Sequence, residues 1–414
     1  MFTLIVSVAV SMFIVLIFKF LNMKHNPPIF GIYQQKNKGY WIKFIFMYTV
    51  LSIKQLINHI MRLLAVEFGH DLNSAENEYI LQHDINLEQK YDLGDYPQAV
   101  DGVYFNGMSK GGAAVICGLA RRPKHRCDAF LYLKVDNEDL LVSPNLPDTH
   151  LEQNTSEQGE YSVQGITINN FMPMRAWTLS YNGEMKSRSN PEKRVKVDVA
   201  LTWSANWTPY EYDTQMPPSG IADVVAREPW SSDYFRLLKK LHQTHYEQMG
   251  FIKGTAIIDG KVHLLNMPCL RDRSFGPLRD WRNFHRYVYH FIFLENGDCM
   301  AVGTVSEPTV LSHLTIGYVC RKADQAVLSV DSSDFQLYQH GENQILPKDY
   351  GFVFKSGGQS YSVKIMVNDE DVFYIGKERE AKFYERWCSV EVNGVKGWAC
   401  VEWHYNNVQN RNKK

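Results

Sequence analysis

The sequence lacks an excess of charge of either sign, and this absence narrows the functions open to the protein. Its 44 lysines and arginines are matched by 45 aspartates and glutamates, so the formal net charge is −1 at pH 7. A nearly neutral chain offers no broad electrostatic attraction for a nucleic-acid backbone. We therefore expect no nucleic-acid partner.

Cysteine is also scarce, and no two cysteines have the Cys-x-x-Cys spacing of common zinc and dithiol redox motifs. The 7 cysteines are scattered between Cys117 and Cys400, a pattern typical of buried free thiols. We expect no metal and no cofactor. Apolar residues are abundant instead, at 45% hydrophobic and 13% aromatic over 414 residues, which suffices for two domains with separate cores.

A first apolar run extends without charge from Phe2 to Phe18. If residues 19–23 are included, with the Lys19 side chain extending toward the lipid headgroups, the run is about as long as the shortest membrane-spanning helices. No basic residue precedes it and no small-x-small cleavage site follows it, so we expect a transmembrane signal-anchor over residues 1–24 rather than a cleaved signal peptide. Lysines flank the run only on its C-terminal side, which predicts a single-pass membrane protein of the endoplasmic reticulum whose body faces the cytoplasm.

A second apolar stretch, residues 40–66, has helical periodicity with one polar arc and one apolar arc. This predicts an amphipathic, membrane-associated helix that lies in the bilayer interface. Packing of its apolar arc on the protein body explains the pattern equally well. A hairpin that crosses the membrane with the first run also stays open, and it would expose the sequons at Asn154 and Asn206 to glycosylation.

After a charged connector over residues 67–90, the periodicity changes from helical to alternating, which indicates β-strands. The segment from Val195 to Trp203 alternates apolar with mostly polar residues, as expected for a half-buried strand. Four Asn-Gly or Asp-Gly pairs separate extended runs and predict tight hairpins, at residues 182–183, 259–260, 296–297 and 393–394. The chain is therefore expected to be mainly β, built from antiparallel barrels or sandwiches.

One convincing soluble helix is predicted from about Ser232 to Met249, with Ser231 or Ser232 as its N-cap. We expect this helix to link two β lobes. The first lobe would then comprise residues 67–249 with the linking helix, the second residues 250–407, and residues 408–414 would form a polar tail.

A dense cluster of charges lies just inside the expected second lobe, between Cys269 and Trp281. One explanation is a structural network of ion pairs that pins a loop across the mouth of a barrel. The other is that Asp272, buried among aromatic side chains, has a raised pKa and donates a proton to a bound substrate.

The run Arg271-Asp272-Arg273-Ser274-Phe275-Gly276, followed by Arg279-Asp280-Trp281, resembles the Asp-His-x-Trp-Gly and Arg-x-Trp signature of the hydroxyneurosporene synthases, the carotenoid 1,2-hydratases. The resemblance covers most of residues 246–405. It implies two tandem lipocalin-like antiparallel β-barrel lobes and the addition of water to an isolated double bond of an isoprenoid. It also implies that Asp272 is the catalytic acid and that Gly276, Arg279 and Trp281 support it.

The chain departs from the family at two positions, with Arg273 in place of the histidine and Phe275 in place of the tryptophan. A guanidinium beside Asp272 would lower the pKa of that carboxyl and oppose proton donation. Two functions therefore stay open, a hydro-lyase of the hydratase type and a non-catalytic lipid-carrier or interaction protein.

In either function the expected ligand is a hydrophobic small molecule, such as an isoprenoid, sterol, retinoid or fatty-acyl compound, held in a dry barrel lumen and delivered from the membrane. Glu402 and His404, on the last expected strand, could point into that lumen. The predicted ligand-binding residues are Arg271, Arg273, Phe275, Arg279, Trp281, Glu402 and His404.

Overall fold

The computed structural model describes residues 7–8, 10–15, 17–18, 26–67, 82–135 and 138–408. The predicted anchor over residues 1–24 is described only in part, and residues 409–414 of the predicted tail lie outside the described residues. Within the described ranges, no helix is both long enough and apolar enough to cross a bilayer.

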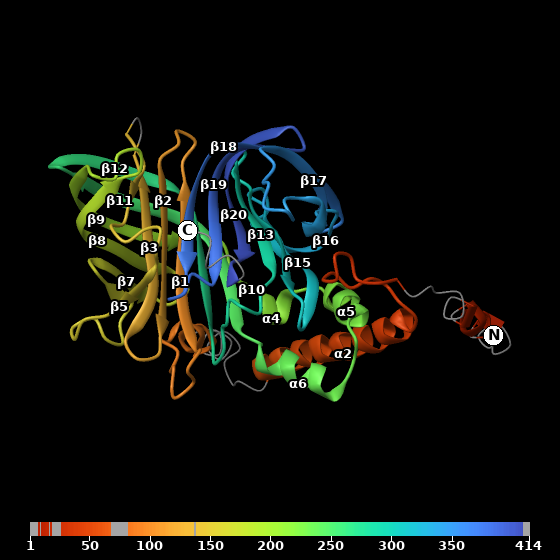
Figure 1. Ribbon diagram of the computed structural model, residues 1–414. Helices are drawn as coiled ribbons and strands as arrows, with labels where there is room; N and C mark the ends of the chain where they lie inside the picture. Colours follow the sequence, from red (N-terminus) through yellow and green to blue (C-terminus); the bar gives the residue numbers. More distant parts are fainter. Residues whose placement is uncertain are drawn as a thin grey trace.

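Two β units lie side by side, with the helices gathered beside the second (Figure 1). The strands of the first unit are β1 (Val100–Met108), β2 (Ala114–Arg122), β3 (Arg126–Lys134), β4 (Leu141–Val142), β5 (His150–Glu152), β6 (Ser162–Val163), β7 (Ile166–Met172), β8 (Ala176–Ser187), β9 (Arg194–Ala205), β10 (Tyr210–Glu211), β11 (Thr244–Ile258) and β12 (Lys261–Gly276).

The first unit closes into a barrel. Its strand β9 pairs with β8 on one side and with β11 on the other, while β12 pairs with β1. The pairings β11-β12-β1-β2-β3-β4-β8-β9 therefore return to β11. We call this closed circuit the first barrel.

The second unit is a closed antiparallel barrel in which each strand pairs with the next along the chain and the last pairs with the first. This up-and-down order is the architecture of lipocalins. Its strands are β13 (Arg286–Leu294), β14 (Cys299–Glu307), β15 (Leu311–Cys320), β16 (Val327–Ser333), β17 (Asp349–Ser356), β18 (Gln359–Ile375), β19 (Ala381–Val392) and β20 (Val395–Asn406).

Side chains fill both barrel interiors. In β9, Val197, Leu201 and Trp203 point inward into the apolar core of the first barrel. The second barrel has its own core, which includes Val288 and Trp403. Eight-stranded barrels are either filled by side chains or hold one small ligand. Here the apolar cores occupy the interiors, where a dry lumen for a ligand was expected.

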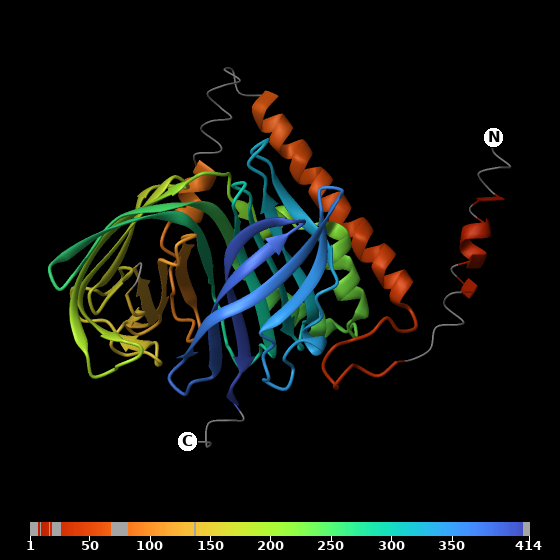
Figure 2. The ribbon, with the colours of Figure 1, turned by 90° about the horizontal axis from the view of Figure 1, so that it is seen from above.

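The described helices include α2 (Tyr40–Glu67), α4 (Tyr212–Gln215), α5 (Pro218–Arg227) and α6 (Ser232–Lys240), with a short 3₁₀ turn η1 (Leu337–Gln339). Helix α2 packs against α5, which contacts β15 of the second barrel (Figure 2). Lys43 and Gln55 of α2 donate to the backbone carbonyls of Glu228 and Met216, at 2.7 and 3.1 Å. The packing of α2 on the body thus includes its polar arc.

The predicted helix that follows Ser231 is shorter than expected. Ser231 is its N-cap, as predicted, and its hydroxyl accepts a hydrogen bond from the Tyr234 amide at 3.0 Å. The helix ends at Lys240, and strand β11 begins at Thr244 rather than after Met249. Pairing of residues 244–258 with β12 outweighs the local helical pattern.

The boundary between the two units also differs from the expected position near Gly250. Both β11 and β12 belong to the first barrel, so the chain passes to the second between Gly276 and Arg286. Residues 269–276 of the charged cluster form part of strand β12 rather than a loop across a barrel mouth. The hairpin of β11 and β12 closes the first barrel, because β11 pairs with β9 and β12 pairs with β1.

Three of the four predicted tight turns are present, at residues 259–260, 296–297 and 393–394, where they join consecutive strands. Asp259 and Gly260 have φ of 48 and 84°, as a type I′ turn requires. The fourth prediction is wrong, because Asn182 and Gly183 lie within β8 and pair with Asp198 and Val197 of β9.

Candidate functional site

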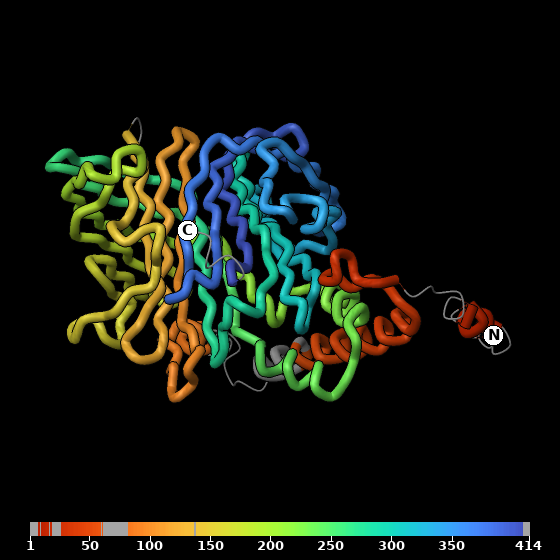
Figure 3. The backbone as a smooth tube through the Cα atoms, in the orientation of Figure 1, coloured from red at the N-terminus to blue at the C-terminus, as the bar shows by residue number. Residues whose placement is uncertain are grey.

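The two barrels meet through their outer faces, along an interface whose strands include β1, β11 and β12 on one side and β13, β19 and β20 on the other. Figure 3 shows β1 running beside the C-terminal strands. Ring contacts cross this interface, including Phe130 with Phe373 at 4.4 Å between centroids and Tyr104 with Phe291 at 6.0 Å. Because both faces of these strands are buried, polar residues here lie in a dry environment.

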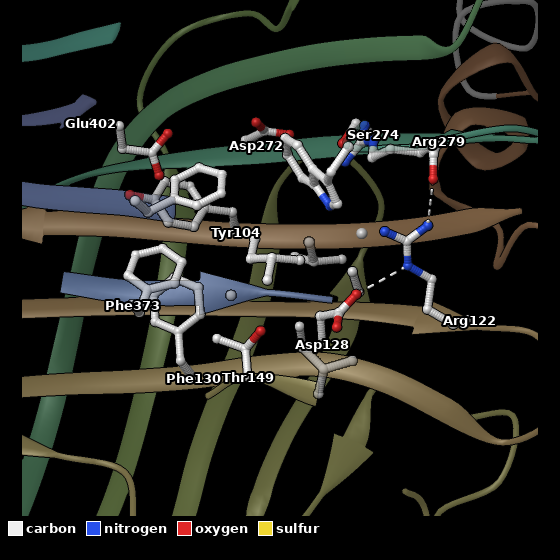
Figure 4. Close-up of a pocket in the computed structure, with 18 of the residues that line it drawn as sticks. Tyr104, Arg122, Asp128, Phe130, Thr149, Asp272, Ser274, Arg279, Phe373 and Glu402 are labelled. Atoms are coloured by element: carbon white, nitrogen blue, oxygen red, sulfur yellow. Dashed lines mark hydrogen bonds and ion pairs between the residues drawn. The ribbon is translucent and has the colours of Figure 1, made fainter. Parts of the chain in front are cut away.

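A pocket of about 110 Å³ opens in this interface (Figure 4). That volume is below the range of pockets that enclose a drug-sized ligand, so it fits a small molecule or one end of a larger one. Its walls are largely aromatic, with Tyr104, Phe130, Trp281, Tyr287, Phe373 and Phe383. Its charged residues are Arg122, Asp128, Asp272, Arg279 and Glu402.

A pair of buried carboxyl groups lies beside the pocket. Glu385 of β19 and Glu402 of β20 are directly opposed across the hairpin, and their relative exposures are 0 and 8%. The Tyr104 hydroxyl donates to Glu385 at 3.2 Å, and the Tyr287 hydroxyl donates to Glu402 at 3.1 Å. Tyr104 comes from the first barrel, so the pair is completed across the interface.

This pair retains a proton at neutral pH. Burial raises the pKa of Glu385 to about 7. Burial and the adjacent Glu385 carboxyl raise the pKa of Glu402 well above its usual value. Two neighbouring carboxylates cannot both be charged in a dry site, so they share a proton over the neutral range.

A second cluster, His245, Glu247 and Asp272, lies on the outer faces of β11 and β12. The His245 Nε2 is 3.2 Å from an Asp272 oxygen and 3.3 Å from a Glu247 oxygen. Burial alone would lower the pKa of His245, but the two carboxylates outweigh it and raise the pKa to about 10. The ring is therefore an imidazolium at neutral pH.

The same three residues are the ones that could hold a metal ion, since their ligand atoms lie within 4.8 Å of one another. One imidazole with two carboxylates is a donor set that suits several divalent cations. The protonated His245 offsets one of the two negative charges, and burial raises the pKa of Glu247, which favours the neutral form of that carboxyl.

Two arginines lie at the other end of the pocket from Glu402, as Figure 4 shows. Arg122 pairs with Asp128 at 3.1 Å and donates to the Arg279 carbonyl at 3.1 Å. Arg279 donates through Nε to the Gln243 amide oxygen at 2.6 Å. Burial and the neighbouring Arg122 lower the pKa of Arg279 to about 10, so it stays charged.

The structure brings four of the predicted site residues to the pocket, Asp272, Arg279, Trp281 and Glu402. Glu402 points into the interface between the barrels rather than into a lumen. The predicted catalytic role of Asp272 stays a prediction.

Arg271 and Arg273 point the other way, into the first barrel, because side chains alternate along a strand. Arg273 pairs with Asp101, and Arg271 pairs with Glu88 at 2.8 Å. The guanidinium expected beside Asp272 is therefore on the opposite face of β12. The cation next to Asp272 is instead His245, 3.2 Å from its carboxylate.

Phe275 and His404 lie outside the pocket lining. The Phe275 ring packs on Tyr91, with centroids 5.3 Å apart, and receives the Arg273 guanidinium over its face at 4.9 Å. His404 is buried among rings, including Tyr287 stacked at 5.0 Å, and neither ring nitrogen has a partner among the described residues. Burial lowers the pKa of His404 to about 3, so the ring is neutral.

Sequence reasoning missed Glu385, Tyr104 and the pairing of Glu247 with Asp272, although hairpin register gave a signal for two of these. Glu385 and Glu402 are equidistant from the predicted turn at residues 393–394, so hairpin register alone pairs them. Glu247 is related to Asp272 in the same way through the turn at residues 259–260. Tyr104 had no such signal because it reaches the site across the interface.

The pocket and fold define a two-barrel β protein with an acid-rich interface. The chain belongs to a family of unknown function, DUF8627, which it matches over residues 4–405. No curated protein matches its sequence.

Among solved structures, one similar chain is a protein assigned to AttH from Nitrosomonas europaea, with TM-score 0.45 and 9% identity over 74% of this chain and 92% of that one. Kievitone hydratase from Nectria haematococca has TM-score 0.43 and 12% identity, over 77% and 94% of the two chains. CghA with Sch210972 has TM-score 0.41 and 11% identity, over 75% and 89%.

Proposed function

We propose that the interbarrel pocket binds a small unsaturated molecule, or the unsaturated end of a larger one, and that Glu402 protonates its double bond. The observation that carries this proposal is the buried Glu385–Glu402 pair beside an aromatic pocket. A carboxyl that stays protonated near neutral pH is what general acid catalysis requires. Aromatic walls supply the apolar surroundings that an alkene prefers.

The chemistry is an acid-initiated hydration. The Glu402 proton bonds to one carbon of the double bond with the π electron pair, which leaves a carbocation at the other carbon and a carboxylate at Glu402. The ring faces of Phe373, Phe383 and Tyr104 stabilise the cation. Water then adds to the cation and returns a proton to the Glu402 carboxylate, so the net change is addition of water.

The test is turnover by the full-length protein with a panel of unsaturated isoprenoids and fatty acids in heavy-oxygen water, followed by mass spectrometry. Glu402→Gln keeps the shape of the side chain but removes the proton, and it should lower the rate at least ~100-fold. Glu391→Gln, on the neighbouring strand β19 but half exposed and paired with Lys364 at 2.7 Å, is the matched control and should behave as wild type. Full activity of Glu402→Gln would remove Glu402 from the mechanism, and ligand binding without any turnover would favour a carrier.

We further propose that α2 lies on a lipid bilayer and brings the protein to an apolar ligand. The outward side of α2 is apolar and exposed, with Ile42 at 62%, Phe46 at 57% and Leu56 at 57% relative exposure. Its inward side is already occupied by the body, since Tyr40 is buried and bonded to Asp223. Apolar residues of the preceding segment are exposed as well, including Phe13 at 64%. One partner, the bilayer, would cover both surfaces.

Site-specific fluorophores on the full-length protein test this placement, because all seven native cysteines are buried and an introduced cysteine is labelled selectively. Labels at Phe46→Cys and Ile53→Cys should be quenched by phosphatidylcholine vesicles that contain a brominated lipid. A label at Leu264→Cys, on β12 and 83% exposed, is the control and should not be quenched. If the brominated lipid leaves the fluorescence of the labels at positions 46 and 53 unchanged, as it should at position 264, the proposed membrane contact of α2 is refuted.

A further inference from the structure

The Arg279 guanidinium forms no direct ion pair in the part of the chain that the structure describes, although it lies in the pocket, and the carboxylates of Asp272 and Glu307 act on it only at longer range. Its one hydrogen-bond partner through Nε, Gln243, is a neutral amide. Arg279 is only partly exposed to solvent, and a partly desolvated charge is stabilised by a counter-charge. An unpaired guanidinium that faces a cavity therefore points to an anion from outside the chain.

The nearby carboxylates are already engaged. Asp128 pairs with Arg122 at 3.1 Å, Asp280 pairs with Arg282 at 2.6 Å, and Asp272 pairs with His245 at 3.2 Å. Asp272 and Glu307 act on Arg279 only at longer range. Burial raises the pKa of Glu307 to about 7, which reduces its charge at neutral pH. No carboxylate in the described ranges thus neutralises Arg279 directly.

The two ends of the pocket differ in character. Arg279 and Arg122 lie at one end, and Glu402 lies at the other together with the rings of Phe130 and Phe373 (Figure 4). The planar guanidinium of Arg279, with the Trp281 ring 5.8 Å from its central carbon, is suited to a bidentate contact with a carboxylate.

We infer that the ligand is an amphipathic acid, whose carboxylate binds Arg279 and whose unsaturated or aromatic portion lies along the pocket toward Glu402. This rests on the proposed function and narrows its ligand class from apolar compounds in general to unsaturated carboxylic acids. A neutral hydrocarbon would leave Arg279 unpaired, whereas a carboxylate satisfies it and fixes which end of the molecule reaches the Glu402 proton.

Isothermal titration of the full-length protein with matched ligand pairs tests the inference. The pairs are cinnamate with cinnamamide and a series of unsaturated fatty acids with their primary amides, and inorganic phosphate and acetate are added as plain anions. Wild type should bind the acids at least ~10-fold more tightly than the amides. Arg279→Gln should abolish that preference by lowering the affinity for the acids. Arg282→Gln, which removes a nearby but half-exposed arginine, should retain it.

The outcomes separate this inference from the proposed function. Equal binding of acid and amide by wild type, or an acid preference that survives Arg279→Gln, overturns the inference while the Glu402 chemistry stands. Phosphate or acetate that binds as tightly as cinnamate also overturns it, in favour of a plain anion site. Failure of every acid and every amide to bind wild type overturns both.

Discussion

At the scale of single residues, the first barrel holds charge within its largely apolar core. The Arg271 guanidinium lies inside this barrel, 4.9 Å from the Trp203 ring centroid and 5.2 Å from that of Trp177. Its carboxylate partner, Glu88, comes from the helical segment at residues 82–88 and forms the pair at 2.8 Å. This interaction ties that segment to the barrel interior.

Arg271→Met should lower the free energy of unfolding by about 3–5 kcal/mol, because it leaves Glu88 buried and without its charge partner. Arg236→Met removes an arginine whose ion pair with Asp233 is almost fully exposed, and it should cost less than about 1 kcal/mol. Urea unfolding followed by tryptophan fluorescence measures both. Equal effects of the two variants would mean that Arg271 is not held as described.

The Glu385–Glu402 pair should make stability depend on pH. The folded chain keeps a proton on Glu385 up to about pH 7, whereas the unfolded chain releases it near its ordinary pKa of 4.5. The folded state therefore binds more protons between these values, and the free energy of unfolding falls as pH rises through this window. The slope is up to about 1.4 kcal/mol per pH unit for each retained proton.

Glu402→Gln removes one of the two titrating groups, so its unfolding free energy should fall less steeply than that of wild type between about pH 4.5 and 7. The other titrating groups contribute equally to the slopes of the two proteins, so their contributions cancel in the comparison. Denaturant titrations at closely spaced pH values give the two slopes, and Glu391→Gln should match wild type. Identical slopes for Glu402→Gln and wild type would show that the pair does not hold a proton in this range.

At the scale of elements, closure of the first barrel depends on close approach of β9 and β11. Gly254 of β11 has φ of +150°, and a Cβ there would lie 2.1 Å from the Ala200 carbonyl oxygen of β9. No side chain fits without separating the two strands. Gly260, in the turn of the same hairpin, has nothing within 4 Å of the place that a Cβ would occupy.

Gly254→Ala should therefore destabilise the fold by about 3 kcal/mol or more, through both steric clash and backbone strain. Gly260→Ala meets only the strain of a positive φ and should cost about 1 kcal/mol. Thermal unfolding monitored by circular dichroism compares the two. A milder effect at Gly254 than at Gly260 would contradict the closed circuit of strands.

The sequence is a good guide to elements and a poorer guide to their ends. Alternation identifies strand β9, and the Asp259-Gly260 turn locates the β11–β12 hairpin. The helix that begins after Ser231 is predicted too long, because its early residues have helical spacing and only long-range pairing with β12 shows where β11 starts. Asn182-Gly183 resembles a turn because local sequence does not reveal that β9 continues the pairing past it.

At the scale of the whole molecule, the chain enters the second barrel after Gly276, and a chain cut tests this. Coexpressed fragments 1–282 and 283–414 keep every strand of each barrel intact and should copurify as one folded complex. Fragments 1–249 and 250–414 divide β11 and deprive the first barrel of two strands, so they should not. Size-exclusion chromatography and near-ultraviolet circular dichroism distinguish the outcomes, and a stable complex from the second cut alone would contradict the assignment of β11 and β12.

The candidate site could be predicted only in part because it forms between two barrels. Asp272, Arg279, Trp281 and Glu402 are recognisable from local sequence and do line the pocket. Their relation to Tyr104 depends on how the outer faces of the barrels dock, which no periodicity in either half encodes. Once residues 261–276 are known to form a strand, alternation alone predicts that the side chains of Asp272 and Arg273 point to opposite faces.

The distribution of the buried thiols provides a way to follow how the molecule comes apart. Cys117, Cys127 and Cys269 lie in the first core and Cys388 in the second. The remaining three, Cys299, Cys320 and Cys400, lie in the clusters between the barrels. If an alkylating reagent modifies only these last three, the two barrels have separated while each barrel stays folded. A time course of cysteine labelling can therefore distinguish opening of the interface from global unfolding.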